Sequence, residues 1–126
     1  MNAKGEFEVK LTAQATDDKT MGRVLIDKTF QGDLTAQSNG QMLSAGTNVK
    51  GSAAYVAIEK VSGTLQGRSG TFVLQHTGTL NRGEAQLTVR VVPDSGTDEL
   101  AGLAGGMTIK ITGGKHFYEF EYTLGA

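Results

Sequence analysis

The fold class follows from residues 55–91, YVAIEKVSGTLQGRSGTFVLQHTGTLNRGEAQLTVRV. Within this stretch, three runs alternate side chains between two faces with period two, which is typical of β-strands. Glycine-containing turns at 63–70 and 81–83 separate the runs, and Pro93 ends the last one because proline cannot donate a ladder hydrogen bond. The inward members of the three runs are Tyr55, Ala57, Glu59 and Val61, then Phe72, Leu74 and His76, then Ala85, Leu87, Val89 and Val91.

The flanking sequence extends the same pattern in both directions. Strands are expected at 6–11, 21–30, 34–45, 107–111 and 116–124, and Gly113-Gly114 is typical of a two-residue hairpin turn. The Asn39-Gly40 pair also favours a turn, which weakens the strand expected at 34–45. No helix of normal length is predicted. A count of about eight strands predicts one all-β domain over residues 1–126, a single eight-stranded antiparallel barrel.

Composition restricts the partners and the chemistry. The 126 residues carry a net charge of −1 with both signs interspersed, so no strong field favours nucleic acid or an anionic membrane. The chain has no cysteine, which excludes disulfides, thiolate chemistry and zinc–sulfur sites. Residues 1–5 are not followed by an apolar core, and no apolar run approaches the roughly 20 residues that span a bilayer. We therefore expect no signal peptide, no membrane partner and a cytoplasmic location.

Hairpin register predicts which inward side chains meet. A loop centred on Gly67-Arg68 places Glu59 opposite His76, and neighbouring registers move the two residues to a diagonal. The next hairpin then pairs His76 with Leu87 and Leu74 with Val89. The Gly113-Gly114 turn pairs Ile111 with His116 and Ile109 with Tyr118. All three hairpins agree with one assignment of inside and outside.

The inward face carries a small set of polar groups. A carboxylate opposite an imidazole inside a barrel is a candidate catalytic acid–base pair, here Glu59 and His76, because burial and mutual charge shift both titrations. The alternative is that the two side chains only form a hydrogen-bonded pair within the core. Two histidines and a glutamate without close ligand spacing predict no metal site, and no cofactor is expected. The candidate ligand-binding residues are Tyr55, Phe72, Leu74, His116, Tyr118 and Tyr122.

Four segments resemble a bacterial family known as domain of unknown function 3224. They are GSAAYVAIEKVSGTL (51–65), GRSGTFVLQHTGTL (67–80), VVPDSGTDELAGLAG (91–105) and GKHFYEFEYTL (114–124). The family is similar in fold to the allene-oxide-cyclase-like and dirigent barrels. The resemblance implies an eight-stranded barrel of the calycin-like type and an oligomer. It also places Asn39-Gly40 within the third strand or at its bend. Characterised relatives of that fold cyclise or steer apolar, oxygenated substrates without a cofactor, which is only an analogy for function.

Three functions are compatible with these residues. The first is binding of a small, largely apolar molecule inside the barrel. The second is a cofactor-free isomerase or cyclase, in which Glu59 or His76 moves a proton and Tyr55 or Tyr118 stabilises developing negative charge. The third is an interaction protein, because the outward face is unusually apolar and favours a homo-oligomer. Those outward residues are Val56, Ile58, Val73 and Val92.

Overall fold

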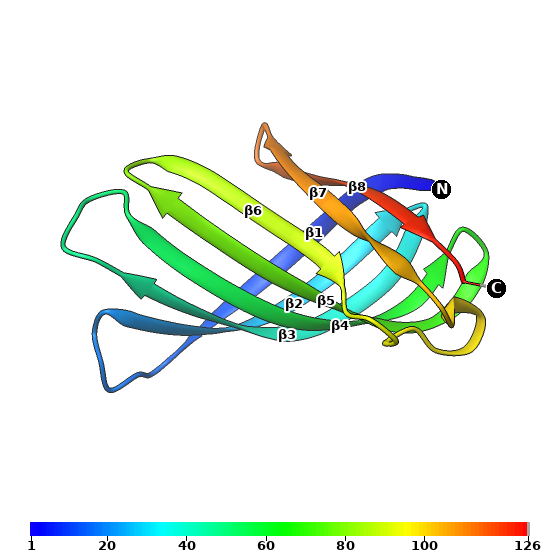
Figure 1. The fold of residues 1–126 in the computed structure, drawn as a ribbon, viewed down its shortest axis with the longest axis horizontal. Helices are drawn as coiled ribbons and strands as arrows, with labels where there is room; N and C mark the ends of the chain where they lie inside the picture. Colours follow the sequence, from blue (N-terminus) through cyan, green and yellow to red (C-terminus); the bar gives the residue numbers. More distant parts are fainter. Residues whose placement is uncertain (126) are drawn as a thin grey trace.

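Eight antiparallel strands close into a barrel in the computed structural model, which describes residues 1–125 (Figure 1). Each strand pairs with the next along the chain, and β8 pairs back with β1, so the predicted barrel is confirmed. A short 3-10 turn, η1 (Asp98–Leu100), lies between β6 and β7. The strands are β1 (Asn2–Gln14), β2 (Met21–Gly32), β3 (Leu34–Gly46), β4 (Ala53–Leu65), β5 (Arg68–Asn81), β6 (Glu84–Val91), β7 (Ala104–Thr112) and β8 (Lys115–Thr123).

The β4–β5 register differs from the predicted one by one step along the ladder. Gln66 and Gly67 form the two-residue turn, both with positive φ, so the turn lies one position earlier than expected. Glu59 therefore lies opposite Leu74, and His76 lies opposite Ala57. The predicted direct pair of Glu59 and His76 is wrong. The two residues are diagonal neighbours, still on the same face because side chains alternate with period two.

The β5–β6 register is shifted for a similar reason. Arg82 and Gly83 make the two-residue turn, with φ values of 51° and 92°. His76 consequently pairs with Val89 instead of Leu87, and Leu74 pairs with Val91 instead of Val89. The β7–β8 register was predicted correctly, with Ile111 opposite His116 and Ile109 opposite Tyr118.

Strand β3 runs straight through the Asn39-Gly40 pair. Gly40 lies opposite Glu59 on the inward face, and a Cβ atom built there would lie 2.7 Å from the Glu59 Cα and would meet the Ile58 carbonyl oxygen. Glycine is therefore required by the close approach of two backbones and not by a hairpin turn. The expected turn is wrong, and of the two positions that the family resemblance implied, within the third strand or at its bend, the structure shows the first.

One end of the barrel, called here the packed half, holds most of the core. The segment 92–103 crosses this end along the free edge of β5, with backbone bonds from Val92 to Val73 and from Thr97 to Thr71. Its Leu100 and Leu103 are buried and fill the end of the barrel. The N-terminus and the end of β8 lie at this end (Figure 1). The largest fully buried apolar or aromatic side chains of the core are Tyr118, Phe30, Phe72, Phe120, Leu34, Leu65, Leu74, Leu100 and Leu103.

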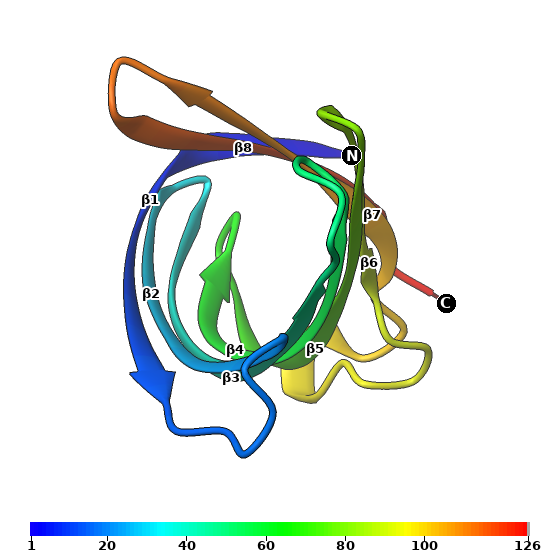
Figure 2. The same cartoon turned by 90° about the vertical axis from the view of Figure 1, so that its left-hand side faces the viewer.

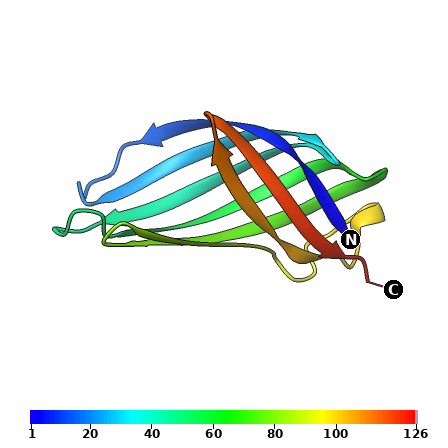
Figure 3. The ribbon, with the colours of Figure 1, turned by 90° about the horizontal axis from the view of Figure 1, so that it is seen from above.

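At the opposite end, called here the open half, strand pairing does not continue around the whole barrel. β6 and β7 pair at only two positions, Val89 with Met107 and Arg90 with Gly106, and β8 pairs with β1 only over Asn2–Phe7. Beyond these positions the β7–β8 hairpin runs diagonally to β5 and β6 and leaves the ring of strands (Figures 2 and 3). Inward apolar side chains stay exposed here: Leu11 (55%), Leu80 (42%), Leu87 (42%) and Ile111 (65%).

The outward face of β4 carries the exposed apolar residues expected there. Val56 and Ile58 are 50% and 53% exposed, whereas Val73 and Val92 are half-buried where the 92–103 segment crosses β5. Leu43, 50% exposed, lies opposite Val56 and extends the apolar surface onto β3. Association of copies of the chain through this face stays a prediction. Within residues 1–125, no helix is long and apolar enough to cross a membrane.

We expect Gly40→Ala to destabilise the barrel. The added methyl group has to displace backbone atoms of β4, and overpacking of this kind costs about 1–3 kcal/mol. Gly46→Ala is the matched control, because the nearest atom to its Cβ would be a carbonyl oxygen at 3.9 Å. The free energy of unfolding, measured by urea denaturation, should fall in the first variant and change little in the second. Equal effects would contradict the close-approach explanation.

Candidate functional site

A fully buried carboxylate lies at the boundary between the two halves. Glu59 has no exposed surface, and its two oxygens accept three hydrogen bonds from side chains. Lys28 Nζ lies 2.9 Å from Oε1, His76 Nε2 lies 2.6 Å from the same oxygen, and Ser38 Oγ donates to Oε2 at 2.5 Å. We call these four side chains the Glu59 network.

Four neighbouring strands supply one member each. Lys28 on β2 lies directly opposite Ser38 on β3, which places both beside Glu59 on β4. Ser38 pairs with Val61 and His76 on β5 pairs with Ala57, so each lies on a diagonal to Glu59. The diagonal positions are within reach of long side chains across a twisted ladder. The network thus depends on the register of three consecutive hairpins.

The electrostatics of Glu59 favour its ionised form. Burial by itself raises the pKa of Glu59, because it disfavours charge. The hydrogen bond from His76, the positive charge of Lys28 and the hydrogen bond from Ser38 outweigh burial and lower the pKa to about 2. At neutral pH the network therefore contains a carboxylate, and its partners must be the hydrogen-bond donors.

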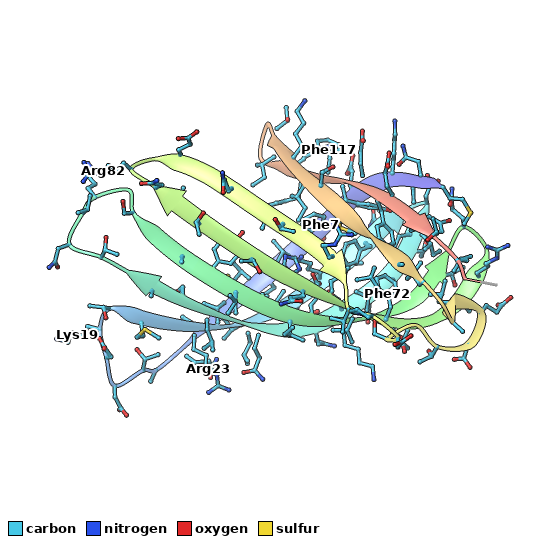
Figure 4. The ribbon with its side chains drawn as sticks, in the orientation of Figure 1. Phe7, Lys19, Arg23, Phe72, Arg82 and Phe117 are labelled. Atoms are coloured by element: carbon cyan, nitrogen blue, oxygen red, sulfur yellow. The ribbon has the colours of Figure 1, made fainter. Side chains whose placement is uncertain are left out.

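Aromatic rings cover the ammonium group of Lys28. Its Nζ lies 4.8 Å from the centre of the Phe7 ring and 5.8 Å from that of Phe30, which are cation–π distances. The Phe7 ring is also 5.1 Å from the ring of His116. In Figure 4, Phe7 lies nearer to the open half than Phe72 does, and Phe72 lies in the packed half.

The structure brings Glu59 and His76 together but separates the other candidate residues. Phe72, Leu74, Tyr118 and Tyr122 are all buried in the core of the packed half. The Tyr118 hydroxyl accepts a hydrogen bond from the Leu34 amide at 2.8 Å and donates to the Gln31 carbonyl at 2.9 Å. These two hydrogen bonds join the Tyr118 hydroxyl to the β2–β3 turn. The Tyr122 hydroxyl donates to the side chain of Gln66, and its ring stacks on Phe120 at 5.2 Å.

Tyr55 and His116 lie towards the open half. The Tyr55 ring lies over Gly78, its cross-strand partner, so closely that a Cβ atom at Gly78 would collide with the ring. Burial raises the pKa of the Tyr55 hydroxyl. His116 is half-buried and, with Phe7 and Val9, lines a hollow of about 380 Å³ where the β7–β8 hairpin leaves β1. That volume is within the range of small-molecule sites.

A larger hollow, of about 870 Å³, lies on the outside of the barrel. Its lining is mostly polar and includes Gln31, Gln37, Asn39 and Lys60 from β2, β3 and β4. The lining also includes Phe30 and Ala36, but none of the four side chains of the Glu59 network. We therefore assign the candidate site to the smaller hollow and to the open half.

Sequence analysis missed Lys28 and Ser38. Their positions carried a signal, because Lys28 shares its face with Ile26 and Phe30, and Ser38 shares its face with Leu34 and Ala36. A lysine among inward apolar residues is a strong sign of a buried ion pair. Within residues 1–125, no group of three histidine or acidic side chains lies in a position to hold a metal ion.

We expect the network to make stability fall in acid. Because the pKa of Glu59 is lowered, ionised Glu59 stabilises the folded state in full above about pH 4.5. This stabilisation is lost as the pH falls towards about 2. The linkage amounts to about 3 kcal/mol. The difference in unfolding free energy between the wild type and Glu59→Gln should therefore shrink across this window, as measured by denaturation at each pH.

Glu119→Gln provides the control for that titration. Glu119 is an exposed carboxylate whose Oε1 lies 3.8 Å from Lys4 Nζ, and surface pairs contribute about 0–1 kcal/mol. Its effect should be small at every pH. An unchanged difference between the wild type and Glu59→Gln from pH 6 to 2 would contradict the ionised network.

Comparisons with known proteins agree with this architecture. The family model described as "Protein of unknown function (DUF3224)" matches residues 3–122. A crystal structure of a DUF3224 protein of unknown function from Shewanella oneidensis MR-1 is 50% identical to this chain. The match covers 100% of this chain and 98% of that one, with a TM-score of 0.95. No curated protein matches, and the likeness to allene-oxide-cyclase-like barrels stays a prediction. The chain is a member of the DUF3224 family.

Proposed function

We propose that this protein binds a small, largely apolar molecule in the open half of its barrel. The observation that carries the proposal is the exposure of apolar side chains on the inward face there. Leu87 and Ile111 are 42% and 65% exposed, although Val89 and Met107, further along the inward faces of β6 and β7, are buried. An apolar molecule seated among them would remove this surface from water, at about 25 cal/mol per Å².

Access to this surface is supported by the incomplete strand pairing. The β7–β8 hairpin leaves both β6 and β1, so the inward face is reachable from the side as well as from the end. The 380 Å³ hollow beside Phe7 and His116 lies at this seam. Apolar walls with a few polar groups at one end are typical of small-molecule sites. The polar and charged side chains that line this hollow are Glu6, Glu8, Lys115 and His116.

Binding is better supported than acid–base catalysis by Glu59. With a pKa of about 2, this side chain cannot donate a proton near neutral pH and is a weak base. Its two oxygens are already occupied by Lys28, His76 and Ser38. The hydroxyl of Tyr118, considered for stabilising negative charge, is bonded to backbone groups in the packed half. Tyr55 alone among the predicted tyrosines lies towards the open half.

Binding can be measured with a polarity-sensitive naphthalene dye and matched glutamate variants. Leu87→Glu places a charge on the inward face of the open half, whereas Leu43→Glu places one on the outward face at similar exposure. We expect Leu87→Glu to weaken dye binding at least tenfold, since loss of one buried leucine contact corresponds to about 1.5–3 kcal/mol. Leu43→Glu should leave the affinity unchanged.

Thermal unfolding of both variants provides the check on folding. Their midpoints should remain close to that of the wild type, because both leucines are partly exposed already. Equal loss of dye binding in the two variants would place the dye outside the barrel. Absence of dye binding to the folded wild-type protein would overturn the proposal.

A further inference from the structure

We propose, resting on the binding function above, that the outer part of the β7–β8 hairpin closes onto β6 and β1 when the apolar ligand is bound. This part comprises residues 108–115 and is called here the flap. In the structure it stands away from both neighbouring strands (Figures 2 and 3). Closure extends two ladders that already exist and completes the ring of strands around the open half.

The ladder between β6 and β7 already has the register that closure needs. Val89 pairs with Met107, so the same ladder, continued towards the tip of the hairpin, puts Leu87 opposite Ile109. All four residues belong to the inward faces of their strands. In the open arrangement Leu87 is exposed and Ile109 is half-buried. Closure therefore brings apolar side chains together without a slip in register.

The facing edges of β6 and β7 also carry backbone groups that lack a ladder partner. Successive residues of an antiparallel strand direct their N–H and C=O groups to opposite neighbours. Val92 N–H donates to Val73 O on β5, so the odd-numbered residues of β6 direct these groups towards β7. Their ladder partners, the odd-numbered residues of β7, direct theirs towards β6. Within residues 1–125, those without a ladder partner on this side are Ala85, Leu87, Ile109 and Ile111.

The outward side chains agree with the closed arrangement. Phe7 pairs with His116, so the next position of the β1–β8 ladder puts Glu8 opposite Lys115. Opposite charges stabilise a cross-strand pair, whereas like charges directly opposite each other destabilise it. Continuing either ladder brings no like charges directly opposite each other. The hollow of about 380 Å³ is lined by both Glu8 and Lys115, and it is the gap that closure removes.

Closure depends on the ligand because the enclosed space has to be filled. Leu11 on β1 and Leu80 on β5 are exposed, so they do not pack against each other across the open half. A ring closed around them without a ligand would leave wall atoms without contacts on one side. An apolar ligand fills this space and contacts the flap only in the closed form. A ligand shifts a conformational equilibrium by this kind of difference in affinity.

Amide hydrogen exchange, measured by NMR on the wild-type protein, tests the closure directly. The amides of Leu87 and Ile109 should exchange at least about tenfold more slowly when the naphthalene dye is bound, because closure gives each of them an acceptor. The Lys110 amide is the control. It is directed towards β8, where Lys110 pairs with Phe117 in both forms, so its exchange should change little.

A disulfide trap tests the register of the closed form. The chain has no cysteine, so thiols can be introduced in pairs. Gln86→Cys and Lys110→Cys together place two thiols directly opposite each other in the closed ladder, within reach of a disulfide. We expect this disulfide to form at least about tenfold faster with the dye than without it. Before oxidation, the double variant should bind the dye as the wild type does, because both side chains point outward.

Glu84→Cys combined with Thr108→Cys is the matched control for the trap. These two positions also lie on the outward faces of β6 and β7. In the closed ladder they are offset by four residues, which is roughly 13 Å along a strand. Their thiols should therefore fail to link with or without the dye.

The outcomes separate the flap from the binding function. If the dye binds but changes neither the exchange of Leu87 and Ile109 nor the rate of the trap, the apolar site stands and the flap is wrong. Equal linking of the control pair would also overturn the flap, because the closed register would then be wrong. Full protection of Leu87 and Ile109 without the dye would contradict closure by the ligand. If the dye does not bind to the folded wild-type protein, both proposals fail.

Discussion

The ionised carboxylate of Glu59, with no exposed surface, is the constraint on which the rest of the barrel depends. Moving a carboxylate out of water costs several kcal/mol unless charge and hydrogen bonds replace the solvent. Lys28, Ser38 and His76 provide them from three other strands. A slip of one residue in any of the β2–β5 hairpins would turn a partner to the outside. The network therefore selects one register among those that the apolar pattern alone would allow.

The two halves of the barrel differ because strand pairing ends at their boundary, whereas the alternation of inward apolar side chains continues across it. Inward apolar residues continue along β6 and β7 into the open half, yet they are buried only as far as Val89 and Met107. In the packed half, the 92–103 segment occupies the free edge of β5 and inserts Leu100 and Leu103. No described segment does the same at the other end. The same inward pattern thus yields a core at one end and an accessible apolar wall at the other.

Alternation along the strands was sufficient to predict the barrel and to place Glu59 and His76 on one face. It could not fix the exact register, because the two-residue turns at Gln66-Gly67 and Arg82-Gly83 use non-glycine residues with positive φ. Lys28 and Ser38 were visible as polar residues at inward positions. The separation of Tyr118 and Tyr122 from Tyr55 was not, because all three obey the same alternation. The half in which each tyrosine lies depends on how far along the strands the pairing of neighbouring strands extends.

Glu59 determines the state of its neighbours although it has no exposed surface. It determines which nitrogen of His76 carries the proton, and it holds the Lys28 ammonium beside that ring. Substitution of Glu59 would therefore change the surroundings of Lys28 and His76 at once and weaken the fold as well. Substitution of His76 changes only one of those groups. For this reason, substitution of His76 is the better test of the chemistry of the site, and substitution of Glu59 is the better test of the stability of the barrel.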